Sequence, residues 1–161
     1  MSDVINLEVG QAAPKFSCLD SNGNNHSLEQ YMNDGKSVIL YFYPKDSTPG
    51  CTTQACDFRD SMSRLNNGEY VVLGVSKDSA KSHDKFIDKQ NLNFPLLMDE
   101  DTSLHQLYGA WREKSMYGRT YMGIQRATFI INADGKIGQV WPKVKVAGHA
   151  EDVLDHLRAG G

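Results

Sequence analysis

Cysteine is scarce in this chain, which has only three among its 161 residues. Three cysteines are too few for the disulfide framework of a small secreted domain, and a chain of this length can build a hydrophobic core without one. No apolar run approaches the roughly 20 residues of a membrane-spanning helix, so no membrane partner is expected. The composition is that of a soluble globular protein, with 40% hydrophobic and 23% charged residues.

Positive charge is not in excess either. The formal net charge is −3, from 17 Lys and Arg residues against 20 Asp and Glu residues. Without a sustained basic run, binding to nucleic acid or to an anionic membrane surface is not expected. No basic region followed by an apolar stretch opens the sequence, so the expected compartment is the cytoplasm. In such a reducing compartment, paired cysteines are usually catalytic or metal-binding.

Strand and helix patterns alternate along the chain without a repeat or a linker, so residues 1–161 are expected to form one domain. Two continuous apolar runs, Ser37–Tyr43 and Tyr70–Ser76, predict buried central strands. The remaining predicted elements are helices over residues 49–66, 79–90, 101–108 and 149–157, strands over 94–98, 125–132 and 137–141, and an N-terminal hairpin from residues 15–19 and 26–28. This order predicts an α/β fold, a three-layer sandwich in which helices flank a mixed β-sheet.

The most informative segment runs from Thr48 to Cys56. Thr48 suits the N-cap of the helix predicted to follow, and Pro49 suits its first position, so Cys51 falls in the first turn. A helix N-terminus carries about half a positive charge and favours a thiolate over a thiol. A thiolate is a nucleophile, and Cys56 gives its oxidised product a bonding partner. The segment therefore predicts a redox site.

Helical spacing separates the two cysteines. The helix face expected to pack on the sheet carries Cys51, Ala55, Phe58, Met62 and Leu65. Cys56 lies about 140° around the helix from Cys51, and the two Cα atoms are expected to lie roughly 8 to 9 Å apart. A disulfide needs a separation below about 7 Å. A bond between Cys51 and Cys56 therefore requires the intervening segment to unwind.

A distant cation could complete the site. Arg126 stands at the start of the strand predicted for residues 125–132, from which it could reach the end of the sheet. A thiolate, the Thr48 hydroxyl, backbone amides and a guanidinium in one pocket would suit attack on a peroxide O–O bond, because the donors stabilise charge on the departing oxygen. The five histidines have no metal-ligand spacing, so neither a metal nor another cofactor is expected.

The segment Tyr41–Asp60, with Pro44, Thr48 and Cys51 at characteristic positions, resembles the peroxiredoxins, and specifically the bacterioferritin comigratory protein or peroxiredoxin Q subfamily. The resemblance extends to residues 9–14, 70–76, 94–99, 123–132 and 148–149. It implies a thioredoxin-like fold and a monomer. Pro44, Thr48 and Arg126 match the supporting active-site positions of the family.

The same resemblance implies the roles of the two cysteines. Cys51 would be the peroxidatic cysteine, oxidised to a sulfenic acid by hydrogen peroxide or an alkyl hydroperoxide. Cys56 would be the resolving cysteine, which forms an intramolecular disulfide with Cys51. Thioredoxin or a similar dithiol protein would then reduce this disulfide.

Two positions depart from the family pattern. Gln54 stands where many members have a glutamate, and Cys18 has no counterpart. Because Cys18 alternates with Phe16 in a predicted strand, we expect a buried and inert thiol there.

Two other functions remain open at this point. A general disulfide oxidoreductase is one, although that chemistry usually employs Cys-x-x-Cys, and four residues separate Cys51 from Cys56. The other is a redox-switched binding module, in which unwinding near Cys56 would expose Phe58 and Met62.

Overall fold

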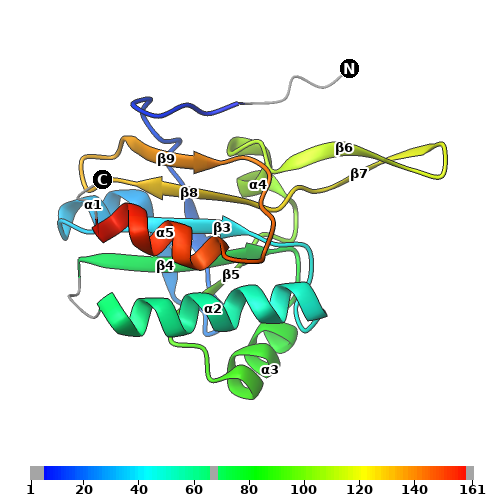
Figure 1. Cartoon of the computed structure of the whole chain (residues 1–161), viewed down its shortest axis with the longest axis horizontal. Helices are drawn as coiled ribbons and strands as arrows, with labels where there is room; N and C mark the ends of the chain where they lie inside the picture. Colours follow the sequence, from blue (N-terminus) through cyan, green and yellow to red (C-terminus); the bar gives the residue numbers. More distant parts are fainter. Residues whose placement is uncertain (1–5, 66–68, 159–161) are drawn as a thin grey trace.

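The computed structural model describes residues 6–65 and 69–158, except for the side chains of residues 64 and 65. Its centre is a sheet with the strand order β5-β4-β3-β8-β9 (Figure 1). The strands are β3 (Ser37–Phe42), β4 (Tyr70–Ser76), β5 (Leu96–Met98), β8 (Ala127–Ile131) and β9 (Ile137–Trp141). The pairs β3–β4 and β4–β5 are parallel, whereas β8 is antiparallel to both β3 and β9. The predicted mixed sheet is therefore confirmed.

Helices cover both faces of this sheet. Alternate residues of β3 point to opposite faces, so that Leu40 and Tyr41 belong to two different hydrophobic clusters. The helices are α1 (Leu28–Asn33), α2 (Pro49–Leu65), α3 (Ala80–Gln90), α4 (Ser103–Leu107) and α5 (His149–Arg158). The cluster around Tyr41 includes residues of α2, α3 and α5, and the cluster around Leu40 includes residues of α1 and α4. The three-layer sandwich is thus confirmed. Within the described ranges, none of these helices combines the length and the apolar character needed to cross a bilayer.

The N-terminal hairpin differs from its prediction in its bounds: the first strand begins at residue 17 rather than 15, and the second covers residues 25–27 rather than 26–28. It consists of β1 (Ser17–Leu19) and β2 (Asn25–Ser27), which pair antiparallel. Leu28, predicted to close the second strand, instead begins α1. The physical reason is a helix cap: the Ser27 hydroxyl accepts a hydrogen bond from the Gln30 amide at 3.2 Å. Residue 66, the predicted end of the second helix, lies outside the described residues.

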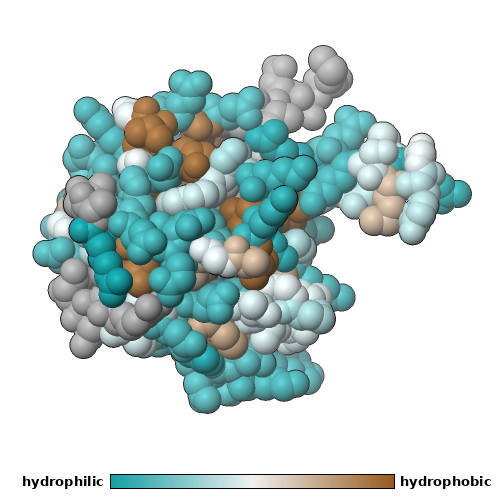
Figure 2. Space-filling view, viewed as in Figure 1, coloured by the Kyte–Doolittle hydropathy of each residue, from teal (hydrophilic) through white to brown (hydrophobic). Residues whose placement is uncertain are grey.

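A second hairpin was not predicted at all. Strands β6 (Trp111–Met116) and β7 (Arg119–Ile124) pair only with each other and project from the body of the molecule (Figure 1). Tyr117 and Gly118 connect them with φ angles of 53° and 75°, the left-handed pair that a tight type I′ turn requires. Its exposed large apolar side chains are Met116, Tyr117, Tyr121 and Met122, and Figure 2 shows pale to brown surface on the projection. Most of its residues are exposed, so the segment lacks the apolar run that marks a buried strand.

Candidate active site

The first turn of α2 holds Cys51 in the interior. The amide of Thr52 donates to the Thr48 carbonyl at 2.8 Å, which makes Thr48 the residue from which the helix starts. Cys51 is the third helical residue and is only 2% exposed. The Thr48 hydroxyl donates to the Lys45 carbonyl at 2.9 Å. Pro44, which is exposed, begins the same loop two residues beyond the end of β3. The predicted position of Cys51 is therefore confirmed.

The orientation of α2 also follows its prediction. Ala55 and Phe58 are fully buried against the sheet, and Met62 packs partly buried beside them. The side chain of Leu65, the last residue of the predicted face, lies outside the described part of the structure. Cys56 is half-buried, and both cysteines are free thiols in one continuous helix.

Arg126, which is far from Cys51 in the sequence, contacts the Cys51 sulfur in the structure. It lies between the end of β7 and the start of β8, and its Nη2 donates to Cys51 Sγ at 3.2 Å. Its Nη1 donates to the Gln54 Oε1 atom. Further positive charge lies close by: burial, and then the charges of Arg126 and Lys143, lower the pKa of Lys114. The structure thus brings a guanidinium onto the sulfur that the sequence singled out.

Two polar side chains beside Cys51 were missed as parts of the site. Gln54 is 1% exposed, and its Nε2 atom has no hydrogen-bond partner in the part of the chain that the structure describes. The same holds for the hydroxyl of Tyr41, whose ring stacks on Phe58 with centroids 4.7 Å apart. Burial is the largest cause that raises the pKa of Tyr41, and Cys51 is the next. Helical spacing of three residues from Cys51 could have placed Gln54 at the site.

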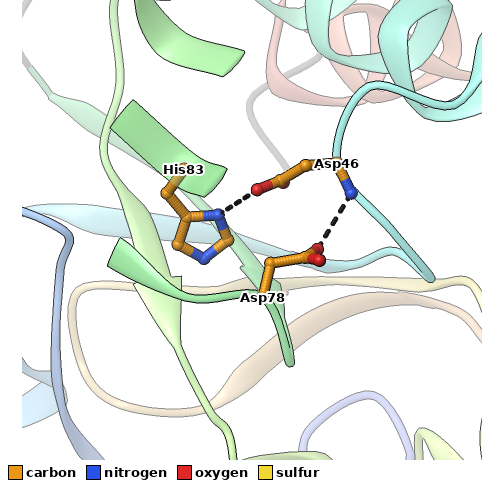
Figure 3. A group of neighbouring side chains, drawn as sticks. All are labelled: Asp46, Asp78 and His83. Atoms are coloured by element: carbon orange, nitrogen blue, oxygen red, sulfur yellow. Dashed lines mark hydrogen bonds and ion pairs between the residues drawn. The ribbon is translucent and has the colours of Figure 1, made fainter. Parts of the chain in front are cut away.

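A cluster of three side chains holds the loop that leads into α2: Asp46 and His83, which are buried, and Asp78, which is half-buried (Figure 3). The Asp46 amide donates to Asp78 Oδ2 at 2.9 Å, and the Asp46 carboxylate lies 2.7 Å from His83 Nδ1. The hydroxyls of Tyr43 and Ser82 donate to the same carboxylate at 2.5 and 2.8 Å. Asp46 is therefore bonded to the segment after β3, to the β4–α3 connection and to α3.

The hydrogen bonds of His83 define its charge. Its Nε2 lies 3.0 Å from the Leu97 carbonyl, which can only accept, and its Nδ1 faces the Asp46 carboxylate. Burial acts to lower the pKa of His83, but the bonds to Asp46 and Leu97 outweigh it and raise that pKa. When the ring is protonated both nitrogens donate, and His83 and Asp46 form a buried ion pair.

The same cluster has the residue types of a metal site. Its ligand atoms, from Asp46, Asp78 and His83, all lie within 4.8 Å of one another. The His83 nitrogens, the Asp46 oxygens and Asp78 Oδ2 already have hydrogen-bond partners within the protein. Since a metal would have to displace the proton between His83 and Asp46, the geometry favours the ion pair.

Cys18 stands apart from this site. It lies in β1, half-buried rather than buried as predicted, and its Sγ donates to the Met98 carbonyl at 3.3 Å. Burial, and then the charge of Asp99, raise the pKa of Cys18 to about 11. At neutral pH this sulfur is therefore a protonated thiol, as an inert cysteine requires.

Comparison with known proteins gives consistent results. The AhpC/TSA family profile matches residues 9–140. The putative peroxiredoxin Bcp of Coxiella burnetii is 50% identical over 153 residues, which are 95% of this chain and 100% of the relative. Peroxiredoxin Bcp of Bacillus subtilis is 44% identical over 152 residues, 94% and 96% of the two chains.

Solved structures agree in fold. The Xanthomonas campestris bacterioferritin comigratory protein, studied for its alkyl peroxide reduction activity, superposes with a TM-score of 0.86 at 42% identity, over 98% of this chain and 99% of that one. A Xylella fastidiosa PrxQ structure gives a TM-score of 0.89 at 37% identity, over 97% and 98%.

The chain therefore belongs to the AhpC/TSA family, and its relatives named above are peroxiredoxin enzymes. Within that family it is a peroxiredoxin of the bacterioferritin comigratory protein or peroxiredoxin Q subfamily. The resemblance noted in the sequence and the thioredoxin-like fold class are confirmed.

Proposed function

We propose that this peroxiredoxin reduces hydrogen peroxide and alkyl hydroperoxides through a sulfenic acid on Cys51. The observation that carries the proposal is the 3.2 Å contact between Arg126 Nη2 and Cys51 Sγ at the first turn of α2. A guanidinium and a helix N-terminus both favour negative charge on a neighbouring sulfur. The alkyl peroxide reduction studied in the Xanthomonas campestris relative supports this substrate class.

In the first step, the Cys51 thiolate attacks the terminal oxygen of the peroxide. The O–O bond breaks, Cys51 becomes a sulfenic acid, and the departing alkoxide or hydroxide takes up a proton. Arg126, fixed by Gln54, stabilises the charge on the reacting oxygens. We assign a second donor role to the Thr48 hydroxyl, after it leaves the Lys45 carbonyl, and a shielding role to Pro44.

In the second step, Cys56 attacks the oxidised Cys51 sulfur and an intramolecular disulfide forms. Because an intact helix holds the two Cα atoms too far apart for a disulfide, residues 51–56 unwind locally. Thioredoxin or a similar dithiol protein of the cytoplasm reduces the disulfide, and the helix forms again. We expect the protein to act as a monomer, which light scattering of the reduced and oxidised protein would test.

Mass spectrometry after one equivalent of hydrogen peroxide tests the proposal. We expect a loss of about 2 Da and a Cys51–Cys56 crosslink in the peptide map. Cys51→Ser should lower peroxide consumption at least about a thousandfold, since it removes the nucleophile. Cys56→Ser should be oxidised once and then fail to turn over with thioredoxin.

Cys18→Ser is the matched control, because Cys18 lies outside the site, and it should behave as the unmodified protein. The proposal is wrong if Cys51→Ser and Cys56→Ser both turn over at the rate of the unmodified protein.

A further inference from the structure

A second arginine, Arg59, lies near Cys56. Arg59 follows it by three residues in α2, so the two side chains are neighbours on the helix surface. The Asp60 carboxylate is the largest cause that raises the pKa of Arg59, and Cys56 raises it further through charge and a hydrogen bond. The Cys56 Sγ also donates to Gln90 Oε1 at 3.5 Å. Cys56 therefore has a guanidinium and a side-chain amide as neighbours.

The guanidinium is fixed by the end of α3. Arg59 Nη1 donates to the backbone carbonyl of Gln90, the last residue of that helix. Its Nε donates to Asp60 at 2.9 Å, but the Asp60 side chain is 66% exposed, and such a surface ion pair contributes little. The Gln90 carbonyl is therefore the principal anchor that keeps the charge of Arg59 beside Cys56.

The backbone of α2 is also fastened at this point. The Asn93 side-chain amide donates to the Arg59 carbonyl and to the Ser63 hydroxyl, both at 3.1 Å. Phe58, one residue before Arg59, is fully buried. The helix is thus held behind Cys56, while the segment from Cys51 to Cys56 is the part that the proposed function requires to unwind. Arg59 stays in place when that segment opens.

We propose, building on the function proposed above, that Arg59 is a positioning residue for the second step: its guanidinium, anchored on the Gln90 carbonyl, stabilises the negative charge on the Cys56 sulfur as this sulfur attacks. The Cys56 thiolate attacks the sulfur of the Cys51 sulfenic acid, the S–S bond forms, the S–O bond breaks, and hydroxide leaves and takes up a proton as water. The Cys56 thiolate supplies the electron pair of the S–S bond, and the electron pair of the S–O bond leaves with the hydroxide, so that Cys56 is oxidised and the Cys51 sulfur is reduced. The Gln90 side-chain amide serves both states, because it accepts from the thiol and, after rotation, donates to the thiolate.

Single-turnover kinetics of the full chain separate this role from the first step. Reduced protein is mixed with one equivalent of hydrogen peroxide, without a reductant, and quenched at intervals with a sulfenic-acid reagent and a thiol reagent. Mass spectrometry then gives the rate of Cys51 oxidation and the rate of Cys51–Cys56 disulfide formation between pH 6 and pH 9. The variants are Arg59→Gln, which can still donate to the Gln90 carbonyl but has no charge, and Arg59→Lys, which keeps a charge.

In Arg59→Gln we expect Cys51 oxidation within about twofold of the unmodified rate and disulfide formation about tenfold slower at pH 7. The difference in disulfide rate between Arg59→Gln and the unmodified protein should become smaller toward pH 9, where hydroxide deprotonates the thiol without the arginine. Arg59→Lys should restore much of the rate. Arg119→Met, which removes a charge on the exposed hairpin, is the control and should change neither step.

Three results would overturn the inference: an unchanged disulfide rate in Arg59→Gln, a deficit of equal size at every pH, or an Arg59→Lys variant as slow as Arg59→Gln. The second would show a purely structural role. Thermal unfolding identifies a variant that does not fold; if Arg59→Gln is one, Arg59→Met replaces it in the same comparison. Failure of the unmodified protein to form any Cys51–Cys56 disulfide would instead refute the proposed function.

Discussion

Each of the two cysteines of α2 has an arginine as a neighbour, but the two pairs are brought together in different ways. Cys51 is 2% exposed, and Arg126, its partner, is 75 residues away in the sequence. Cys56 is half-buried, and Arg59 is one helical turn away. The first pairing exists only when the sheet is complete, whereas the second needs little more than a helix and the end of α3. Tertiary structure therefore builds one sulfur site and local structure builds the other.

The segment before Cys51 and the segment after Cys56 are held in place by different kinds of contact. The loop before Cys51 is held by the buried ion pair of Asp46 and His83. Behind Cys56, α2 is held by hydrogen bonds from Asn93, whose side chain is exposed. Anchoring before Cys51 and behind Cys56 suits the proposed opening and closing of the segment between them.

Replacing Arg126 should have the largest effect among variants that keep both cysteines. Without the guanidinium, the charge on the reacting oxygens loses a donor, and such a loss costs about 10²- to 10³-fold in rate. We therefore expect Arg126→Met to slow Cys51 oxidation by that factor, measured by competition for hydrogen peroxide. Arg59→Gln should leave the same rate nearly unchanged. Equal effects of the two replacements on Cys51 oxidation would erase the distinction between the two arginines.

Replacing His83 should destabilise the loop before Cys51 in a way that depends on pH. The pKa of His83 is raised in the folded protein, so its contribution is complete below about pH 6.5, the ordinary value, and is lost as the pH rises through the folded value. Leaving Asp46 buried without its partner costs about 3 kcal/mol. We expect His83→Gln to lower the free energy of unfolding by about that amount at pH 6 and by less at pH 9.

Urea denaturation of the unmodified protein and the variant at both pH values measures this difference. The subtraction removes other titrating groups, such as His149, whose pKa burial lowers to about 4. Asn93→Ala, which removes the exposed bonds behind Cys56, is the counterpart and should cost about 1 kcal/mol at either pH. A His83→Gln penalty that grows with pH would contradict the assigned charge.

Replacing Gln54 should have a smaller effect on the first step than replacing Arg126. Its Oε1 orients Arg126, so Gln54→Ala should slow Cys51 oxidation about tenfold by leaving the guanidinium free to turn away. A glutamate at this position can accept the same bond, so Gln54→Glu should stay within about threefold. Disulfide formation, measured in the same quench experiment, should be unchanged in both. A Gln54→Ala variant that oxidises at the normal rate would show that Arg126 needs no second anchor.

The sequence predicted the parts of the molecule with strong local signals. A continuous apolar run predicted β3. A cap residue and a proline predicted the start of α2, and with it the position of Cys51. The hairpin of β6 and β7 was missed because its strands are mostly exposed, so neither an apolar run nor a buried alternation marks them. Its turn, Tyr117-Gly118, carries only one of the residues that usually signal a hairpin.

The rest of the site depends on contacts that span long stretches of sequence. Arg126 could be placed at the end of the sheet, but its bond to Gln54 depends on how β8 lies against α2. Asp46 and His83 are 37 residues apart, and only the parallel pairing of β3 and β4 brings the segments that follow these strands together. From the sequence alone, each of these residues is indistinguishable from an ordinary charged surface residue or an isolated histidine.

The contacts that stabilise the first turn of α2 affect how quickly the proposed disulfide can form after Cys51 is oxidised. The contacts of Arg126 with Gln54 and Cys51 and the burial of Cys51 favour a closed helix, and in the proposed cycle a closed helix delays the meeting of the Cys51 sulfenic acid with Cys56. During this delay, a second peroxide can carry the sulfenic acid to the irreversible sulfinic acid. In the proposed cycle, the ease with which residues 51–56 unwind therefore limits how many cycles one molecule completes before it is inactivated, and changes that stiffen this turn would shorten its working life.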